Sequence, residues 1–185
     1  MAITFHPNGK IDGINNGNFN NSLSSGHVIQ VVTAVKDDAS TYGGSSYADI
    51  SGLSATISGV RAGSKIRVDL NIHVGYNCNG QNFLFKLFRD STFLPHSSGA
   101  SETFFATEYA AGTNYNDMMY NLSFTHFDTH GQSAGTNIVY KIQGNSNSGG
   151  CTTYVNRLPA SSTVRAQSIL TCLLYTSDAA DDCRC

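Results

Sequence analysis

The sequence predicts an all-β protein, an antiparallel β-sandwich with a jelly-roll-like arrangement of strands. In residues 65–74 every second residue is aliphatic, and Lys, Arg, Asp, Asn and His fill the positions between them. Such alternation gives a strand one apolar face and one wet face, as in antiparallel sheets. About eight segments of this kind recur along the chain, with no amphipathic helix between them. Only 13% of residues are charged and 18 are glycine, which is typical of a loop-rich β protein.

The expected strands follow the chain in order. Residues 27–35 are rich in β-branched residues, and residues 47–60 alternate Leu53, Ala55 and Ile57 with Ser and Thr. Apolar residues at every second position also mark the later segments, and Gly, Asn and Ser clusters separate them. A further short strand is expected inside the long loop 97–117. The later expected strands are residues 65–74, 82–89, 118–127, 137–143, 152–156 and 164–171.

The chain divides into three parts. Residues 1–26 are rich in Asn, Gly and Ser and are interpreted as an extended connector or attachment segment. Residues 27–171 form the sandwich domain. Residues 172–185 resemble a translated sequencing adapter and are interpreted as a non-native tail that replaces the natural end of the last strand. The alternative is a natural acidic tail containing cysteine.

The charge balance limits the classes of partner. The chain has 13 acidic and 11 basic residues. Without the tail, which holds Asp178, Asp181, Asp182 and Arg184, ten of each remain. A neutral surface gives no basic footprint for nucleic acid. No apolar run reaches the ~20 residues of a membrane span, and no signal sequence begins the chain, so we expect a protein made in the cytoplasm without membrane insertion.

Short motifs in a consistent order resemble a family of small structural proteins from marine bacteriophages, described as tail or tail-fibre proteins. These motifs cover most of the chain, and it is their order rather than any single motif that carries the resemblance. They are residues 3–5, 9–11, 28–32, 49–53, 64–66, 85–90, 120–127, 140–143, 154–157 and 168–171.

The resemblance implies a homotrimeric jelly-roll head like those of tumour necrosis factor and the globular heads of complement. It also implies a place in the virion tail, contact with other tail proteins, and binding of a glycan or protein receptor on the host surface. We therefore expect a non-catalytic bacteriophage structural protein for assembly and host attachment. The alternative is a monomeric carbohydrate-binding β-sandwich module.

One cluster could hold a metal ion. His126, Asp128 and His130 are spaced so that a continuing strand would point all three the same way, and two imidazoles with a carboxylate suit zinc or iron. The competing interpretation is a turn at residues 128–131, in which Asp128 bonds to nearby backbone amides. That interpretation is preferred, and no metal or other cofactor is expected.

Outside the tail the chain has two cysteines, Cys78 and Cys151, both in loops rich in Gly, Asn and Ser. They could form a disulfide in a virion protein released from the reducing host, or remain free thiols. The sequence leaves both alternatives open, and a disulfide there would be structural.

No catalytic residues are expected. The chain lacks a phosphate-binding glycine loop and a His-Glu-x-x-His motif. Tyrosines near the loops would suit either a recognition surface or packing over the sheet ends. Residues 82–89 are apolar on both faces, and an apolar second face needs cover. The candidate oligomer contacts are therefore Phe83, Leu84, Phe85 and Phe88.

Overall fold

The computed structural model describes residues 4–5, 11–12, 26–44, 46–77, 84–95, 118–146 and 150–176. All of the regular secondary structure in these ranges is β-strand, and no helix there is long and apolar enough to cross a membrane. The strands are β1 (Thr4–Phe5), β2 (Ile11–Asp12), β3 (Val28–Lys36), β4 (Ser40–Gly43), β5 (Ala48–Ile57), β6 (Lys65–Tyr76), β7 (Leu84–Arg89), β8 (Thr92–Leu94), β9 (Tyr120–Asp128), β10 (Ile138–Asn145), β11 (Thr152–Val155) and β12 (Ser168–Tyr175).

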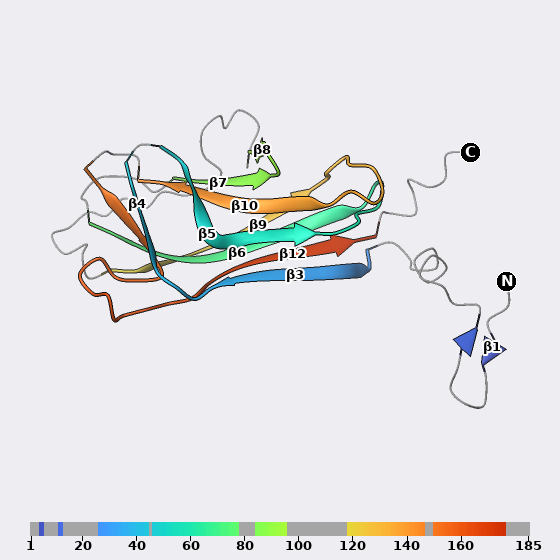
Figure 1. Ribbon diagram of the computed structural model, residues 1–185, viewed down its shortest axis with the longest axis horizontal. Helices are drawn as coiled ribbons and strands as arrows, with labels where there is room; N and C mark the ends of the chain where they lie inside the picture. The colour runs from blue at the N-terminus through green and yellow to red at the C-terminus, as the bar shows by residue number, and fades with distance from the viewer. Residues whose placement is uncertain are drawn as a thin grey trace.

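Two antiparallel sheets pack face to face (Figure 1). One has the order β5-β10-β7-β8. The other has the order β3-β12-β6, continued by β11 and β4, with β9 on the free side of β6. β12 pairs with β3, and β11 pairs with β4 farther along the sheet. β3 and β4 therefore act as one interrupted strand, and β11 and β12 act as another. The chain crosses from one sheet to the other after β4, β5, β6, β8, β9 and β10, which is the order of an eight-stranded jelly roll.

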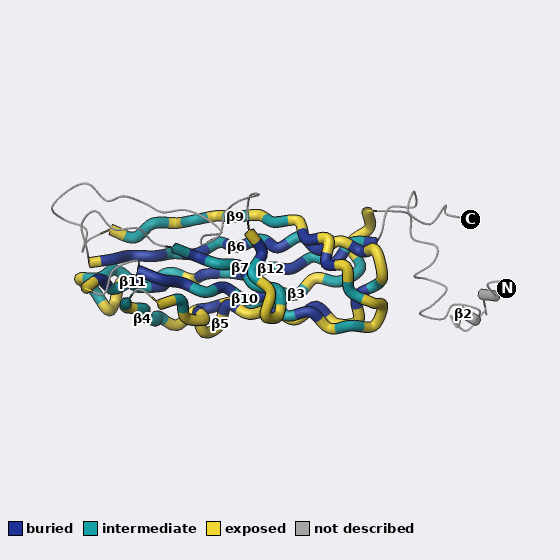
Figure 2. Tube along the Cα trace, turned by 90° about the horizontal axis from the view of Figure 1, so that it is seen from above, coloured by how far each residue is buried: buried dark blue, intermediate teal, exposed yellow. Residues whose placement is uncertain are grey.

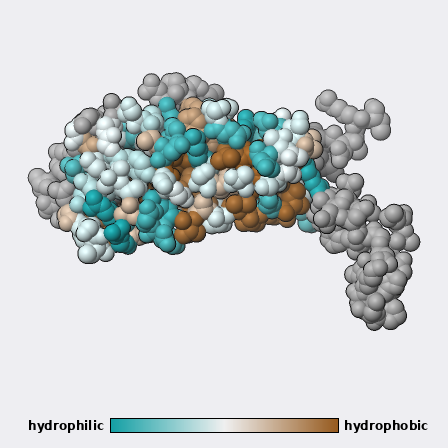
Figure 3. Space-filling view, viewed as in Figure 1, coloured by the Kyte–Doolittle hydropathy of each residue, from teal (hydrophilic) through white to brown (hydrophobic). Residues whose placement is uncertain are grey.

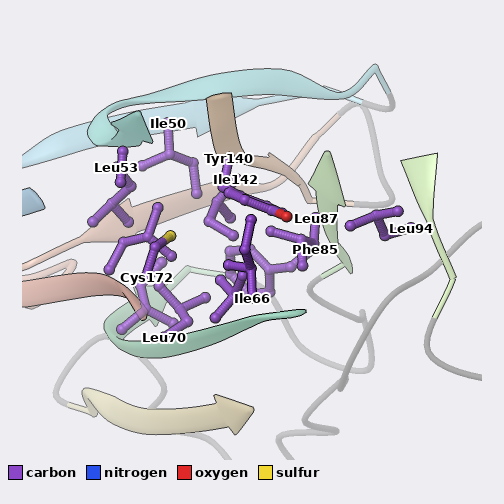
Figure 4. Close-up of a cluster of buried hydrophobic side chains, with 14 of the residues drawn as sticks. Ile50, Leu53, Ile66, Leu70, Phe85, Leu87, Leu94, Tyr140, Ile142 and Cys172 are labelled. Atoms are coloured by element: carbon purple, nitrogen blue, oxygen red, sulfur yellow. The ribbon is translucent and has the colours of Figure 1, made fainter. Parts of the chain in front are cut away.

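The alternation in β6 produces the core. Ile66, Val68 and Ile72 are fully buried, whereas Lys65 is exposed and Arg67 is half-buried on the opposite face. Figure 4 shows side chains of both sheets, among them Leu53, Leu70 and Phe85, pointing toward one another between the layers. Figure 2 shows β9 alternating between exposed and partly buried residues at one border of the body. The sandwich prediction is confirmed, and each sheet has one outward face.

Gly75 lies near the end of β6, where two other segments approach its Cα. A Cβ at this position would lie 2.7 Å from Pro159 Cδ and 3.0 Å from the carbonyl oxygens of Arg157 and Met118. No side chain fits there without moving backbone, so glycine is required by close approach.

The break between β11 and β12 is held by Asn156, which has a positive φ of 62°. Its side-chain Nδ2 donates to the carbonyl oxygens of Lys36 (2.7 Å) and Asp38 (3.0 Å), and its backbone N–H donates to His73 O. Its Oδ1 accepts a hydrogen bond from Ser168 Oγ. One buried residue thus joins β3 and β12 through its side chain and β6 through its backbone N–H, at the point where the outer strand is interrupted.

Some boundaries differ from the predicted ones. The polar stretch after residue 36 contains β4, and the predicted strand 164–171 begins at Ser168. β12 also continues beyond the predicted domain end at residue 171, because Cys172 and Leu174 maintain the alternation and are buried in the core. The sandwich therefore ends at β12 rather than at residue 171, while the non-native origin of residues 172–185 stays a prediction. In the predicted connector, β1 and β2 pair with each other.

Candidate functional site

A buried charge cluster joins the two sheets at the end of β9. Arg89 Nη1 lies 2.7 and 2.9 Å from the two carboxylate oxygens of Asp128, whose side chain is only 6% exposed. The Tyr140 hydroxyl donates to Asp128 Oδ2 at 2.6 Å. Burial and then this hydrogen bond raise the pKa of Tyr140, so the hydroxyl keeps its proton. The cluster ties β9 to β7 and β10 of the opposite sheet.

His130 is 2% exposed and forms a second buried pair, with Ser64. The Gln132 backbone N–H donates to His130 Nδ1 at 2.9 Å, which leaves the proton on Nε2, 3.0 Å from Ser64 Oγ. Ser64 Oγ donates its own proton to Arg61 O at 2.7 Å. A histidine that activates a nucleophilic serine must accept the serine proton, and here the direction is reversed. This arrangement is suited to holding the turn at residues 61–64.

The metal candidate His126, Asp128 and His130 does not gain support. Asp128 is occupied by Arg89 and Tyr140, and both ring nitrogens of His130 are engaged in hydrogen bonds. Across the described ranges no group of three His, Cys, Asp or Glu side chains is placed to hold a metal ion. The spacing was interpreted correctly as one-sided, but that side meets the opposite sheet, which supplies other partners.

Burial lowers the pKa of His130 below its usual value of 6.5. Below pH 6.5 the His130 imidazole therefore takes up a proton in the unfolded chain but stays neutral in the folded protein. The free energy of unfolding should thus fall as the pH drops below that value. Urea unfolding at about pH 7 and about pH 5.5 measures this loss. In His130→Gln, whose amide can keep both hydrogen bonds, the loss should be smaller. An unchanged pH dependence in the variant would rule out this role for His130.

Cys151 is disulfide-bonded, and Cys78 lies outside the described residues. The register of β6 and β11 pairs Tyr76 with Thr153, and Thr152 N–H donates to Asn77 Oδ1 at 2.8 Å. That register, continued by two pairs, would bring position 78 opposite Cys151. The Cys78–Cys151 pairing stays a prediction, and the alternative of a free Cys151 is wrong.

The candidate oligomer contacts fall into three groups. Phe83 lies outside the described residues. Phe85 is 1% exposed and points into the core, so its assignment as a contact was wrong. Leu84 and Phe88 are half-buried on the outward face of β7. Alternation alone could not tell which of the two apolar faces of this strand would be covered by the opposite sheet.

Phe88 belongs to a set of rings and ammonium groups on the outer face of the sheet β5-β10-β7-β8. We call Tyr47, Lys86, Phe88, Phe93 and Lys141 the aromatic–lysine surface. Lys86 Nζ lies 4.0 Å from the centroid of the Tyr47 ring and 5.2 Å from that of Phe93. The rings of Phe88 and Phe93 are 5.9 Å apart, and Lys141 Nζ is 5.9 Å from Phe88. Such contacts hold half-exposed rings in place at a surface.

The outer face of the other sheet carries a hydrogen-bonded array of polar side chains. In β6, Arg67 Nε lies 2.9 Å from the carboxylate of Asp69. Across the strands, Thr125 Oγ1 donates to Asp69 Oδ1 at 2.6 Å, and Asn71 Nδ2 donates to Ser123 Oγ at 3.0 Å. The register places Asp69 opposite Thr125 and Asn71 opposite Ser123.

The array continues toward the interrupted strand. Ser123 Oγ donates to Asn121 Oδ1 at 3.4 Å, and Asn121 Nδ2 donates to His73 Nε2 at 2.9 Å. His73 Nδ1 therefore carries the ring proton, which it donates to Gln167 O at 2.9 Å. Neighbouring side chains thus fix one another's orientation along the sheet.

A hollow of about 340 Å³ lies in this array, above β6 and between β9 and β12. The sequence showed the polar face of β6 but not this hollow, because the hollow depends on the register with β9 and β12. Its lining residues are Asp69, Leu70, Asn71, Ser123, Phe124, Thr125, Ile169 and Thr171.

Comparisons with protein-family models and with curated proteins found no match. Among solved structures, one of infectious bursal disease virus, Gx strain, is similar with a TM-score of 0.30 and 12% sequence identity. The similarity covers 80% of this chain and 37% of that chain. The strand order given above is what defines this protein as a jelly-roll β-sandwich.

Proposed function

We propose that this chain is a non-catalytic structural protein of a bacteriophage virion, a tail or tail-fibre domain that assembles as a homotrimer and binds a receptor on the host surface. It would be made in the host cytoplasm and join other tail proteins. The supporting observation is the eight-stranded jelly-roll order, an architecture common in viral capsid and lectin domains. The motif resemblance to marine bacteriophage tail proteins adds to this fold analogy.

Binding is favoured over catalysis by how the described polar groups are used. Asp128 and His130, the most deeply buried acid and histidine of the described ranges, hold the sandwich together rather than line the hollow. The polar side chains around the hollow are half-buried or exposed and lie on a sheet face. Such a surface suits contact with a partner.

The location is tested by immunogold electron microscopy of virions that carry this gene, with antibody raised against the full chain. We expect gold at the tail, and added protein should compete with virions for adsorption to host cells. If the tails are labelled but added protein does not compete for adsorption, the structural role stands and receptor binding is refuted. Virions that carry no label would overturn the proposal.

The trimer is tested by light scattering, with an expected mass of about three times 19.8 kDa. Phe88→Asp should shift the full chain toward monomer, because it places a charge in the aromatic–lysine surface. Val31→Asp is the matched control, since Val31 is 57% exposed on the opposite sheet. Figure 3 shows that hydrophobic side chains gather on the surface along β3, the strand that carries Val31. Dissociation by Val31→Asp alone would assign assembly to the β3 face instead.

The second candidate is a monomeric carbohydrate-binding module, which the hollow on the outer sheet face favours. The same mass measurement separates the two. A monomer retained on glycan beads supports the module, whereas a trimer supports the virion protein.

A further inference from the structure

We propose that the hollow above β6 binds a neutral saccharide. This inference rests on the proposed receptor-binding function and names both the surface and the class of receptor. The site is built by Asp69 and Asn71 from β6, Ser123 and Thr125 from β9, and Ile169 from β12.

The polar groups of the site are oriented before any ligand arrives. Asp69 is held by Arg67 and Thr125, at 2.9 and 2.6 Å, and Asn71 is held by Ser123 at 3.0 Å. All of these side chains stand on paired strands rather than on loops. Fixed rotamers reduce the ordering entropy that a ligand must overcome, so even a small surface can bind specifically.

The hydrogen-bonding capacity that remains matches hydroxyl groups. A carboxylate offers about four acceptor positions, of which Arg67 and Thr125 occupy part at Asp69. The carbonyl oxygen of the Asn71 amide is a further acceptor, because the amide nitrogen makes the bond to Ser123. Two acceptors on one strand, one pleat repeat apart, can receive O–H groups from one sugar ring.

Part of the lining is apolar. Ile169 and Thr171 lie on the β12 side of the hollow. Leu70 and Phe124 border it as well, but their side chains pack toward the core. A sugar ring presents C–H groups as well as hydroxyls and needs such mixed contact. The volume of about 340 Å³ is at the lower end for ligand sites, which fits one or two sugar rings rather than a peptide helix.

The charge at the site selects a neutral ligand. Among the described residues that line the hollow, Asp69 is the charged one, and its ion pair with Arg67 neutralises it. A phosphate or sulfate would meet the Asp69 carboxylate, and a cation would meet Arg67. Phe127, 64% exposed with Arg67 Cζ 5.9 Å from its ring centroid, gives the same face an aromatic ring beside the pair.

The experiment uses the full chain and an array of neutral bacterial surface saccharides together with dextran, galactan and chitin. We expect binding to at least one neutral glycan, weakened about tenfold or more in Asn71→Ala. The matched control is Gln143→Ala, which removes an outward amide of the opposite sheet, bonded to Asp49. The control should bind like the wild type. Ser123→Trp, which fills the hollow from the exposed edge strand β9, should abolish binding without affecting the mass or unfolding of the protein.

The alternative outcomes overturn the inference in distinct ways. Binding of heparin alone would show an anion site, and binding that survives Ser123→Trp would place the ligand elsewhere. Failure to bind any neutral glycan would also refute the saccharide site. If the full chain still labels tails and competes for adsorption in any of these cases, the proposed function stands and only this site fails. If tails are unlabelled while glycan binding is lost in Asn71→Ala, the site stands and the virion role fails.

Discussion

Replacing Asp128 with asparagine is expected to lower the free energy of unfolding by about 3 kcal/mol, because it leaves the Arg89 guanidinium beside a neutral amide. The Asp128 side chain is 6% exposed and that of Arg89 is 16% exposed, so water replaces little of the lost interaction. The new amide group would also direct N–H donors toward Arg89 or the Tyr140 hydroxyl. Urea unfolding of the full chain measures the change.

Asp49→Asn is the control for this charge effect. Asp49 accepts hydrogen bonds from Lys141 at 2.9 Å and Gln143 at 2.7 Å, but its side chain is 55% exposed. An exposed pair contributes about 0–1 kcal/mol, so this variant should change stability little. Equal losses in the two variants would contradict the structural role of the buried cluster.

Gly75→Ala is expected to cost roughly 2–3 kcal/mol, the upper range for overpacking a well-packed site. The new Cβ would lie 2.7 Å from Pro159 Cδ and 3.0 Å from two carbonyl oxygens, and backbone must move to make room. Thermal and urea unfolding of the full chain both report the loss.

Gly43→Ala tests whether the loss comes from crowding. Gly43 also lies in a strand, but a Cβ there would meet its nearest atom, Cys151 O, at an ordinary 3.6 Å. Its effect should be within about 0.5 kcal/mol, or slightly stabilising through the lower entropy of the unfolded chain. A Gly75→Ala protein as stable as Gly43→Ala would contradict the close approach.

The sequence predicted the strands whose own alternation is strong. β6, β9 and β10 lie where the two-residue period places them, and their inward residues form the core. β4 was missed because Ser40–Gly43 has no apolar period and owes its extended form to pairing with β11. The start of β12 was misplaced because residues 164–167 lie beyond the Asn156 junction and are not paired as part of that strand.

The candidate site was less predictable, since it depends on neighbours far apart in the chain. The spacing showed that His126, Asp128 and His130 share one side of the chain. It could not show that Arg89 and Tyr140 of the opposite sheet bind Asp128. Likewise, the hollow requires Asn71 to face Ser123, a register that alternation in either strand alone does not specify.

The two outer faces lie on opposite sides of the sandwich, with one core between them. Subunits joined through the aromatic–lysine surface would keep three copies of the β6–β9 face pointing away from the threefold axis. Several weak attachments to one cell would then act together, and such linkage can raise overall avidity by about 10²–10⁴ without any new contact. A tail carrying such heads could adhere firmly to a cell although each individual bond breaks and reforms quickly.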